Sequence, residues 1–123
     1  MNVLLVNGSP HKDGNTYKSL KLLGDVLEKH AVTTSIFQIG AGKVRGCLGC
    51  DNCAETQRCM YKDDLCNSLI EAILKADGVV IGSPVYFAGP NGALCALLDR
   101  VFYAATNQAN IFAHKPAAAV VNC

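Results

Sequence analysis

The chain has 123 residues, half of them hydrophobic and 17% charged, with a formal net charge of +1. This length suits a single domain over residues 1–123, and the balanced charge, without a basic or acidic tract, argues against nucleic-acid and membrane-surface partners. The amino terminus lacks the features of an export signal, and no apolar run reaches the ~18 residues of a membrane span. We therefore expect a cytoplasmic protein.

Strand and helix patterns alternate along the chain. In order, they predict a strand at 2–7, a helix from 15 to about 30, a strand at 33–39, a cysteine-rich segment at about 42–62, a helix after Asp63, a strand at 78–82, a loop at 83–91, a helix from 92 to about 105 and a strand at 117–121. This alternation indicates a parallel sheet with right-handed crossovers. We expect a three-layer α/β sandwich with strand order 2-1-3-4 and a fifth strand beyond Cys123.

Some polar side chains have predicted structural roles. Asn15 and Thr16 are good caps for the first helix, and Asp63–Asp64 suits the cap and first turn of the second. Asp99–Arg100 is predicted to be a surface pair or a dimer contact, with the apolar side chains of the same helix facing the core. These apolar side chains are Leu94, Leu97, Leu98, Val101 and Phe102. Cys66 and Cys95 are predicted to be structural.

The segment from Gly8 to Thr16 joins the first strand to the first helix and is a candidate phosphate site. A helix amino terminus offers unpaired N–H groups and a positive dipole end. Ser9, Asn15 and Thr16 add short polar side chains, while Gly8 and Gly14 allow close approach of the backbone. The Lys and spacing of a P-loop are absent. An ordinary capped turn is the alternative.

A second candidate segment, residues 82–91, follows the third predicted strand. It places Tyr86 and Phe87 between prolines and glycines, which suits the face of a planar ring. In a doubly wound sheet this loop and the first one flank the same crevice. The alternative is an aromatic loop packed under another part of the protein.

Together these segments resemble the NADPH-dependent FMN reductase family of flavodoxin-like proteins. The resemblance is carried by the motifs Asn7-Gly8-Ser9-Pro10, Gly14-Asn15-Thr16, Ser83-Pro84-Val85-Tyr86 and Leu98-Asp99-Arg100. It implies that the FMN phosphate is held by Ser9, His11, Gly14, Asn15 and Thr16. It also implies that the isoalloxazine is lined by Pro84, Val85, Tyr86, Phe87 and Ala88. His11 stands where such proteins often have Lys or Arg. No side chain is predicted to be a catalytic acid or base.

Four of the seven cysteines form a compact run: Cys47, Cys50, Cys53 and Cys59. Four thiolates with this spacing can ligate a four-iron ([4Fe–4S]) cluster, and the run is less typical of zinc, which favours two separated C-x2-C pairs. The pattern resembles the iron–sulfur flavoprotein branch of the same family. Free or redox-active thiols and a zinc site are the alternatives.

The sequence thus predicts an oxidoreductase in which FMN accepts hydride or single electrons. The donors and acceptors implied by the resemblance are NAD(P)H, ferredoxin or quinone, and the implied assembly is a homodimer or homotetramer. A cluster-free NAD(P)H-dependent FMN or quinone reductase is one alternative. A zinc- or redox-sensing binding module is another.

Overall fold

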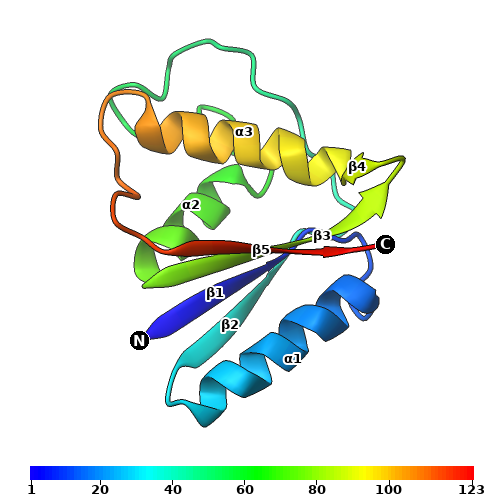
Figure 1. Cartoon of the computed structure of the whole chain (residues 1–123). Helices are drawn as coiled ribbons and strands as arrows, with labels where there is room; N and C mark the ends of the chain where they lie inside the picture. The colour runs from blue at the N-terminus through cyan, green and yellow to red at the C-terminus, as the bar shows by residue number, and fades with distance from the viewer.

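The computed structural model describes residues 1–123 as three layers, with α1 on one face of a sheet and α2 and α3 on the other (Figure 1). The elements are β1 (Asn2–Asn7), α1 (Asn15–Lys29), β2 (Thr33–Gln38), α2 (Cys66–Lys75), β3 (Gly78–Tyr86), β4 (Gly89–Pro90), α3 (Gly92–Thr106) and β5 (Ala117–Asn122). No helix has both the length and the apolar character needed to cross a membrane. The predicted fold class is confirmed.

The sheet has β1 at its centre. β1 pairs in parallel with β2 on one side and with β3 on the other, and β5 pairs in parallel with the outer side of β3. The predicted order 2-1-3-4 is therefore confirmed, with β5 as the fourth parallel strand, because the two-residue β4 lies antiparallel to the end of β3. Parallel pairing brings the carboxyl ends of β1, β3 and β5 to one edge, where a ligand crevice is expected.

The core lies mainly between the sheet and the pair α2 and α3. Leu4 and Val6 of β1 belong to a cluster of 14 buried residues on that side, whereas Leu5 packs with Leu20 and Val80 on the α1 side. β1 is apolar without alternation because both of its faces are covered. The prediction that Phe102 faces the core is wrong, since its side chain is exposed at the edge of α3.

The helix starts differ from the predicted caps. Gly14 is the N-cap of α1, so Asn15 and Thr16 lie inside its first turn and cap nothing. α2 begins at Cys66 with Leu65 as N-cap, and Asp64 accepts a hydrogen bond from the Cys66 N–H at 3.1 Å. Asp63 instead pairs with Arg45. The predicted cap at Asp63 is therefore wrong.

The predicted loop at 83–91 is largely a strand and a tight turn. β3 continues to Tyr86, and Phe87 and Ala88 turn the chain into β4 with φ of +46° and +62°. Positive φ at both central positions is typical of a type I′ hairpin, which glycine and asparagine prefer. Here an aromatic residue and an alanine adopt it, so the turn carries backbone strain.

Candidate functional site

A crevice lies where β1, β3 and β5 end and α1 begins. Its lining residues come from the first loop, the start of α1 and the ends of β3 and β5: Ser9, His11, Gly14, Asn15, Thr16, Pro84, Val85, Tyr86, Asn122 and Cys123. Eight of these are residues that the sequence assigned to a cofactor site. The two predicted segments, about seventy residues apart in the chain, are therefore brought together.

Phe87 and Ala88, the other two residues of that prediction, do not line the crevice. They form the turn between β3 and β4, and the side chain of Phe87 is fully exposed. They lie beyond Tyr86, the last residue of β3 that borders the crevice.

Asn7, at the end of β1, holds the first loop in place. Its side chain is fully buried, and its Nδ2 donates to the carbonyl of His11 at 3.2 Å and to Oε1 of Gln38 at 2.6 Å. Its Oδ1 accepts from the Ser9 N–H at 3.1 Å, and Gln38 Nε2 donates to the Ser9 carbonyl at 2.7 Å. These hydrogen bonds between neutral groups fix the loop and do not use the N–H groups at the start of α1.

A second set of contacts joins the first loop to β3 and α3. Gly8 donates its N–H to the Gly82 carbonyl at 2.8 Å, and Asn91 Nδ2 donates to the Gly8 carbonyl at 2.7 Å. A Cβ on Gly8 would lie 2.5 Å from the Gly82 oxygen and 2.6 Å from Leu94 Cδ2. A side chain at position 8 would therefore push the two walls of the crevice apart.

Asn7, Gln38 and Asn91 were not predicted from the sequence as site residues. The available signal was a polar amide at or next to the carboxyl end of a predicted strand, at Asn7 and at Gln38. Because parallel strands end at one edge, such residues meet there. Asn91 carried a signal as the N-cap of α3, where its Oδ1 accepts from the Ala93 N–H at 3.0 Å.

The amino terminus of α1 presents free donors to the crevice. Gly14 makes no side-chain capping bond, the first turn holds no acidic residue, and the N–H groups of Asn15, Thr16 and Tyr17 donate to no protein acceptor. Unpaired N–H groups at a helix start favour an anion. The crevice can therefore hold a phosphate group at this end, and the residues fit FMN chemically.

The four cysteines of the predicted run line a second hollow, between their loop and α3. Cys47, Cys50, Cys53 and Cys59 share it with side chains of α3, among them Arg100 and Tyr103. None of the cysteines forms a disulfide. The loop thus offers four thiols to one space, which fits a four-iron cluster by its donor set.

The geometry of these thiols differs from that of a single-ion site. No three side chains of the His, Cys, Asp and Glu types are close enough together to hold one metal ion. A zinc site needs four ligands around one point, whereas each cysteine of a four-iron cluster binds a different iron atom. As placed here, the four thiols do not form a four-ligand zinc site.

Two of the loop thiols have shifted pKa values. Burial raises the pKa of Cys53, whereas hydrogen bonds from the backbone and side chain of Asn52 lower the pKa of the exposed Cys50. Cys50 is thus the loop thiol whose surroundings most plainly favour the thiolate, the form that binds metals.

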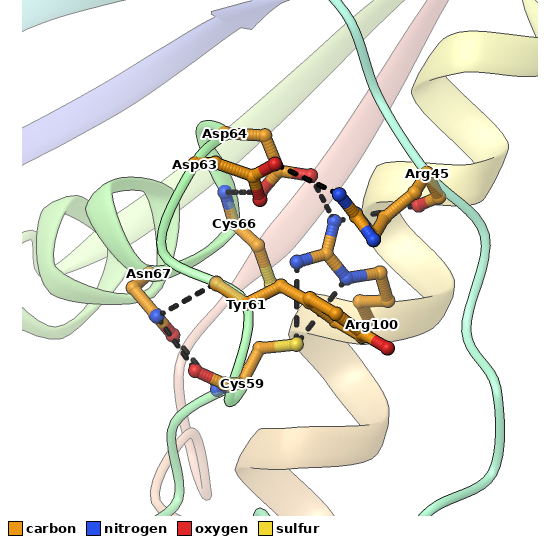
Figure 2. Close-up of polar contacts among 8 residues, drawn as sticks. All are labelled: Arg45, Cys59, Tyr61, Asp63, Asp64, Cys66, Asn67 and Arg100. Carbon is orange, nitrogen blue, oxygen red and sulfur yellow. Dashed lines mark hydrogen bonds and ion pairs between the residues drawn. The ribbon is translucent and has the colours of Figure 1, made fainter.

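Cys59 is fixed at its backbone by α2. Its N–H donates to Asn67 Oδ1 at 2.8 Å, and Asn67 Nδ2 donates to the Cys59 carbonyl at 2.8 Å. This reciprocal pair positions the last cysteine of the run against the first turns of α2 (Figure 2).

Arg100 reaches the Cys59 sulfur from α3, as Figure 2 shows. Its Nε and Nη2 donate to Cys59 Sγ at 3.4 and 3.2 Å, and its Nη1 donates to Asp64 and, at 3.3 Å, to the Arg45 carbonyl. The side chains of Arg100 and Asp64 are only 2% and 3% exposed. The prediction of a surface or dimer role for Arg100 is therefore wrong.

The pKa values around Arg100 follow from burial and pairing. Burial is the largest single influence and disfavours both charged groups, but their mutual hydrogen bond, the other hydrogen bonds to each group and the attraction between the charges together outweigh it. The pKa of Asp64 therefore falls and that of Arg100 rises. Burial raises the pKa of the adjacent Cys66 thiol to about 12. A charged Arg100–Asp64 pair and a neutral Cys66 thiol therefore lie beside Cys59.

Solved structures of reductases share this fold. A flavone reductase aligns with 98% of the chain and 43% of its own length, with a TM-score of 0.72 and 14% identity. The NAD(P)H:acceptor oxidoreductase FerB of Paracoccus denitrificans aligns with 98% of the chain and 59% of its own, with a TM-score of 0.61 and 21% identity. At these identities the likeness concerns the fold alone.

Sequence relatives are nearer. An iron–sulfur flavoprotein of Methanocaldococcus jannaschii is 31% identical over 100 residues, which cover 81% of this chain and 51% of the relative. One of Archaeoglobus fulgidus is 34% identical, covering 81% and 48%. The chain thus spans about half the length of these relatives. Residues 1–122, from β1 through β5, match the family model described as NADPH-dependent FMN reductase, and the chain belongs to that family.

Proposed function

We propose that the chain binds FMN in the crevice between the first loop and the end of β3 and works as a redox flavoprotein. FMN, when bound, supplies hydride and single-electron chemistry, and the protein supplies position and environment. The proposed donors and acceptors are NAD(P)H, ferredoxin or a quinone, in a homodimer or homotetramer.

One observation carries this proposal: the free N–H groups of α1 and the residues that end β3 border one crevice. In the proposed complex, the backbone of Asn15 and Thr16 donates to the phosphate, with Ser9 and His11 beside it. Ser9 is well prepared for this role, because its Oγ already accepts from the His11 N–H at 3.1 Å and is thereby oriented. Pro84, Val85 and Tyr86 offer the surface for the ring.

We propose further that Cys47, Cys50, Cys53 and Cys59 hold a four-iron cluster, which supplies one-electron transfer when bound. Two observations support this: the four thiols border one hollow, and they lie in one compact run of the sequence rather than in two separated C-x2-C pairs. Relatives at about one-third identity bear the name iron–sulfur flavoprotein. The cluster-free reductase and the zinc module are the competing proposals.

A visible spectrum with iron and zinc analysis, on protein purified without oxygen, separates these proposals. We expect flavin bands together with broad absorbance near ~400 nm and about four irons per chain. Flavin without iron would replace the cluster by free thiols and leave a plain reductase. Stoichiometric zinc without flavin would overturn the redox proposal in favour of a binding module.

The crevice is tested by a double substitution at the start of α1. Asn15→Ala with Thr16→Ala removes both polar side chains, and we expect the purified protein to retain less FMN. The matched control is Asn2→Ala with Thr33→Ala, the same residue types at the opposite end of β1 and β2, where they are register partners. Equal FMN content in both double variants would remove the two α1 side chains from the proposed site.

A further inference from the structure

Arg100 is the one cationic side chain that donates a hydrogen bond to a sulfur atom in this chain. The other donors to sulfur are neutral and include the Gly49 N–H, which donates to Cys47, and the side chains of Cys50 and Asn52, which donate to Met60. Among the four loop cysteines, Cys59 alone therefore has a charged donor, and it has two N–H groups from the same guanidinium.

The guanidinium directs its donors at the Asp64 carboxylate, the Cys59 sulfur and the Arg45 carbonyl. Its Nη1 serves the buried carboxylate of Asp64, and Nε and Nη2 together face the Cys59 sulfur. Nε and Nη2 form the edge of the guanidinium that pairs with anionic groups such as carboxylates. A neutral thiol is a weak acceptor, so the fork is matched to a thiolate, the form of a metal ligand.

The fork is also held rigidly. Asp64 lies just before α2 and Arg100 lies on α3, so their pair joins the loop to two helices of the core. The Arg45 carbonyl takes another Nη1 bond at 3.3 Å, and the guanidinium carbon lies 6.0 Å from the ring centre of Tyr61 (Figure 2). Since Asn67 fixes the backbone of Cys59, the sulfur and its donors are positioned independently.

We propose that Arg100 is a positioning residue for Cys59, which orients its sulfur and raises the reduction potential of a four-iron cluster bound there through two N–H···S hydrogen bonds. This inference rests on the proposed cluster. Hydrogen bonds to ligand sulfurs stabilise the reduced, more negative state of such a cluster, so their loss lowers its potential. Asp64 is the residue that keeps Arg100 in place and balances its charge.

Two variants test the hydrogen bonds while the net charge of the pair stays constant. Arg100→Lys keeps the cation beside Asp64 but removes the fork, and Arg100→Met with Asp64→Asn removes both charges together. The control is Arg58→Met, which removes a cation adjacent to Cys59 in the sequence. Arg58 pairs with Glu71 on the surface and donates to no sulfur. Iron content, melting temperature and the cluster midpoint are measured on oxygen-free protein, the midpoint by titration with a low-potential chemical reductant.

We expect a more negative cluster midpoint in both test variants, with the smaller shift in Arg100→Lys and with the Arg58→Met midpoint unchanged. If Arg100 only stabilised the fold, its substitution would alter the melting temperature and leave the cluster midpoint unchanged. Iron-loaded variants with the midpoint of the unaltered protein would overturn the role of Arg100 and leave the cluster proposal intact. Absence of iron from the unaltered protein would instead overturn the proposed cluster itself.

Discussion

The crevice and the cysteine loop are built by opposite means. The crevice is held by neutral amides, Asn7, Gln38 and Asn91, on the ends of regular strands and at a helix cap. The cysteine loop contains no helix or strand, and ion pairs fasten it to the helices, with the buried Arg100–Asp64 pair at its end. One region exposes free donors from a rigid frame, and the other needs charged anchors to order an irregular chain.

This difference indicates which part of each region is sensitive to change. In the crevice the functional groups include backbone N–H groups, which no side-chain substitution removes, so misplacing the loop is a separate way to damage the site. In the cysteine loop the functional groups are side chains, and their positions depend on a charge pair that is costly to break. The following predictions test that contrast, from the largest expected effect to the smallest.

The largest effect is expected from Arg100→Met alone. It leaves the carboxylate of Asp64 buried without its partner, and breaking such a pair costs about 3–5 kcal/mol of unfolding free energy. Addition of Asp64→Asn is expected to restore most of that loss. Urea unfolding in reducing buffer measures both, and equal stability of the single and double variants would show that the pair does not anchor the loop.

Asn7→Ala is expected to lower the unfolding free energy by about 2–3 kcal/mol, because it leaves the buried Ser9 N–H without its acceptor and removes two donated bonds. Asn15→Ala, at an exposed position of the same crevice, is expected to change stability by less than about 0.5 kcal/mol. Urea unfolding of both variants provides the measurement. A similar small loss in both would contradict the role of Asn7 as the centre of the crevice frame.

Alkaline pH is expected to lower the unfolding free energy through ionisation of Cys66, which lies beside the cysteine loop. Burial raises its pKa in the folded state to about 12, so the unfolded chain loses this proton first as pH rises. The contribution of Cys66 to the unfolding free energy is fully present below the pKa of the unfolded chain, about 8.5. Above that pH the contribution falls by about 1.4 kcal/mol per pH unit until the folded pKa is reached. The measurement is the unfolding free energy of the metal-free unaltered protein and of Cys66→Ala at several pH values between these two pKa values. The free energy should fall more steeply with pH in the unaltered protein, and equal slopes in the two proteins would contradict the prediction.

The smallest effect is expected at the β3–β4 turn and is stabilising. Ala88 has φ of +62°, so Ala88→Gly should relieve strain and raise the unfolding free energy by about 1 kcal/mol. Ala93→Gly, in the first turns of α3, is the matched control and should lower it by about 0.5–1 kcal/mol. Thermal unfolding of the two variants checks the opposite signs. A loss in both would mean that the turn is unstrained.

The regular elements could be predicted because their patterns are local. β1 is an uninterrupted apolar run, and α1 and α3 repeat apolar residues at helical spacing, so their bounds agree with the structure to within about a residue. β3 was predicted too short because Ser83 and Pro84 are typical of loops. Pro84 is tolerated there because it lies near the end of β3, where its partner is Asn122 of β5.

The misplacement of Arg100 has a different cause. Arginine is rarely buried, and the partner that makes its burial possible lies 36 residues away, beyond the reach of a local pattern. A usable signal was present, since Leu97 and Ala104 lie three before and four after Arg100 on the buried face of α3. A charged residue in that register needs a buried counter-ion, and Asp64 was a candidate.

Gly82 gives the crevice a property that can be adjusted. A Cβ at this position would lie 2.8 Å from Leu20 Cδ1 and 2.9 Å from Thr16 Cγ2, so two side chains of α1 pack directly against the backbone of β3. The absence of a Cβ at Gly82 therefore allows α1 to lie this close to β3. The Leu20 and Thr16 side chains would have to shift to admit a methyl group, and Thr16 lines the crevice, so the residue at position 82 influences the shape of the crevice wall.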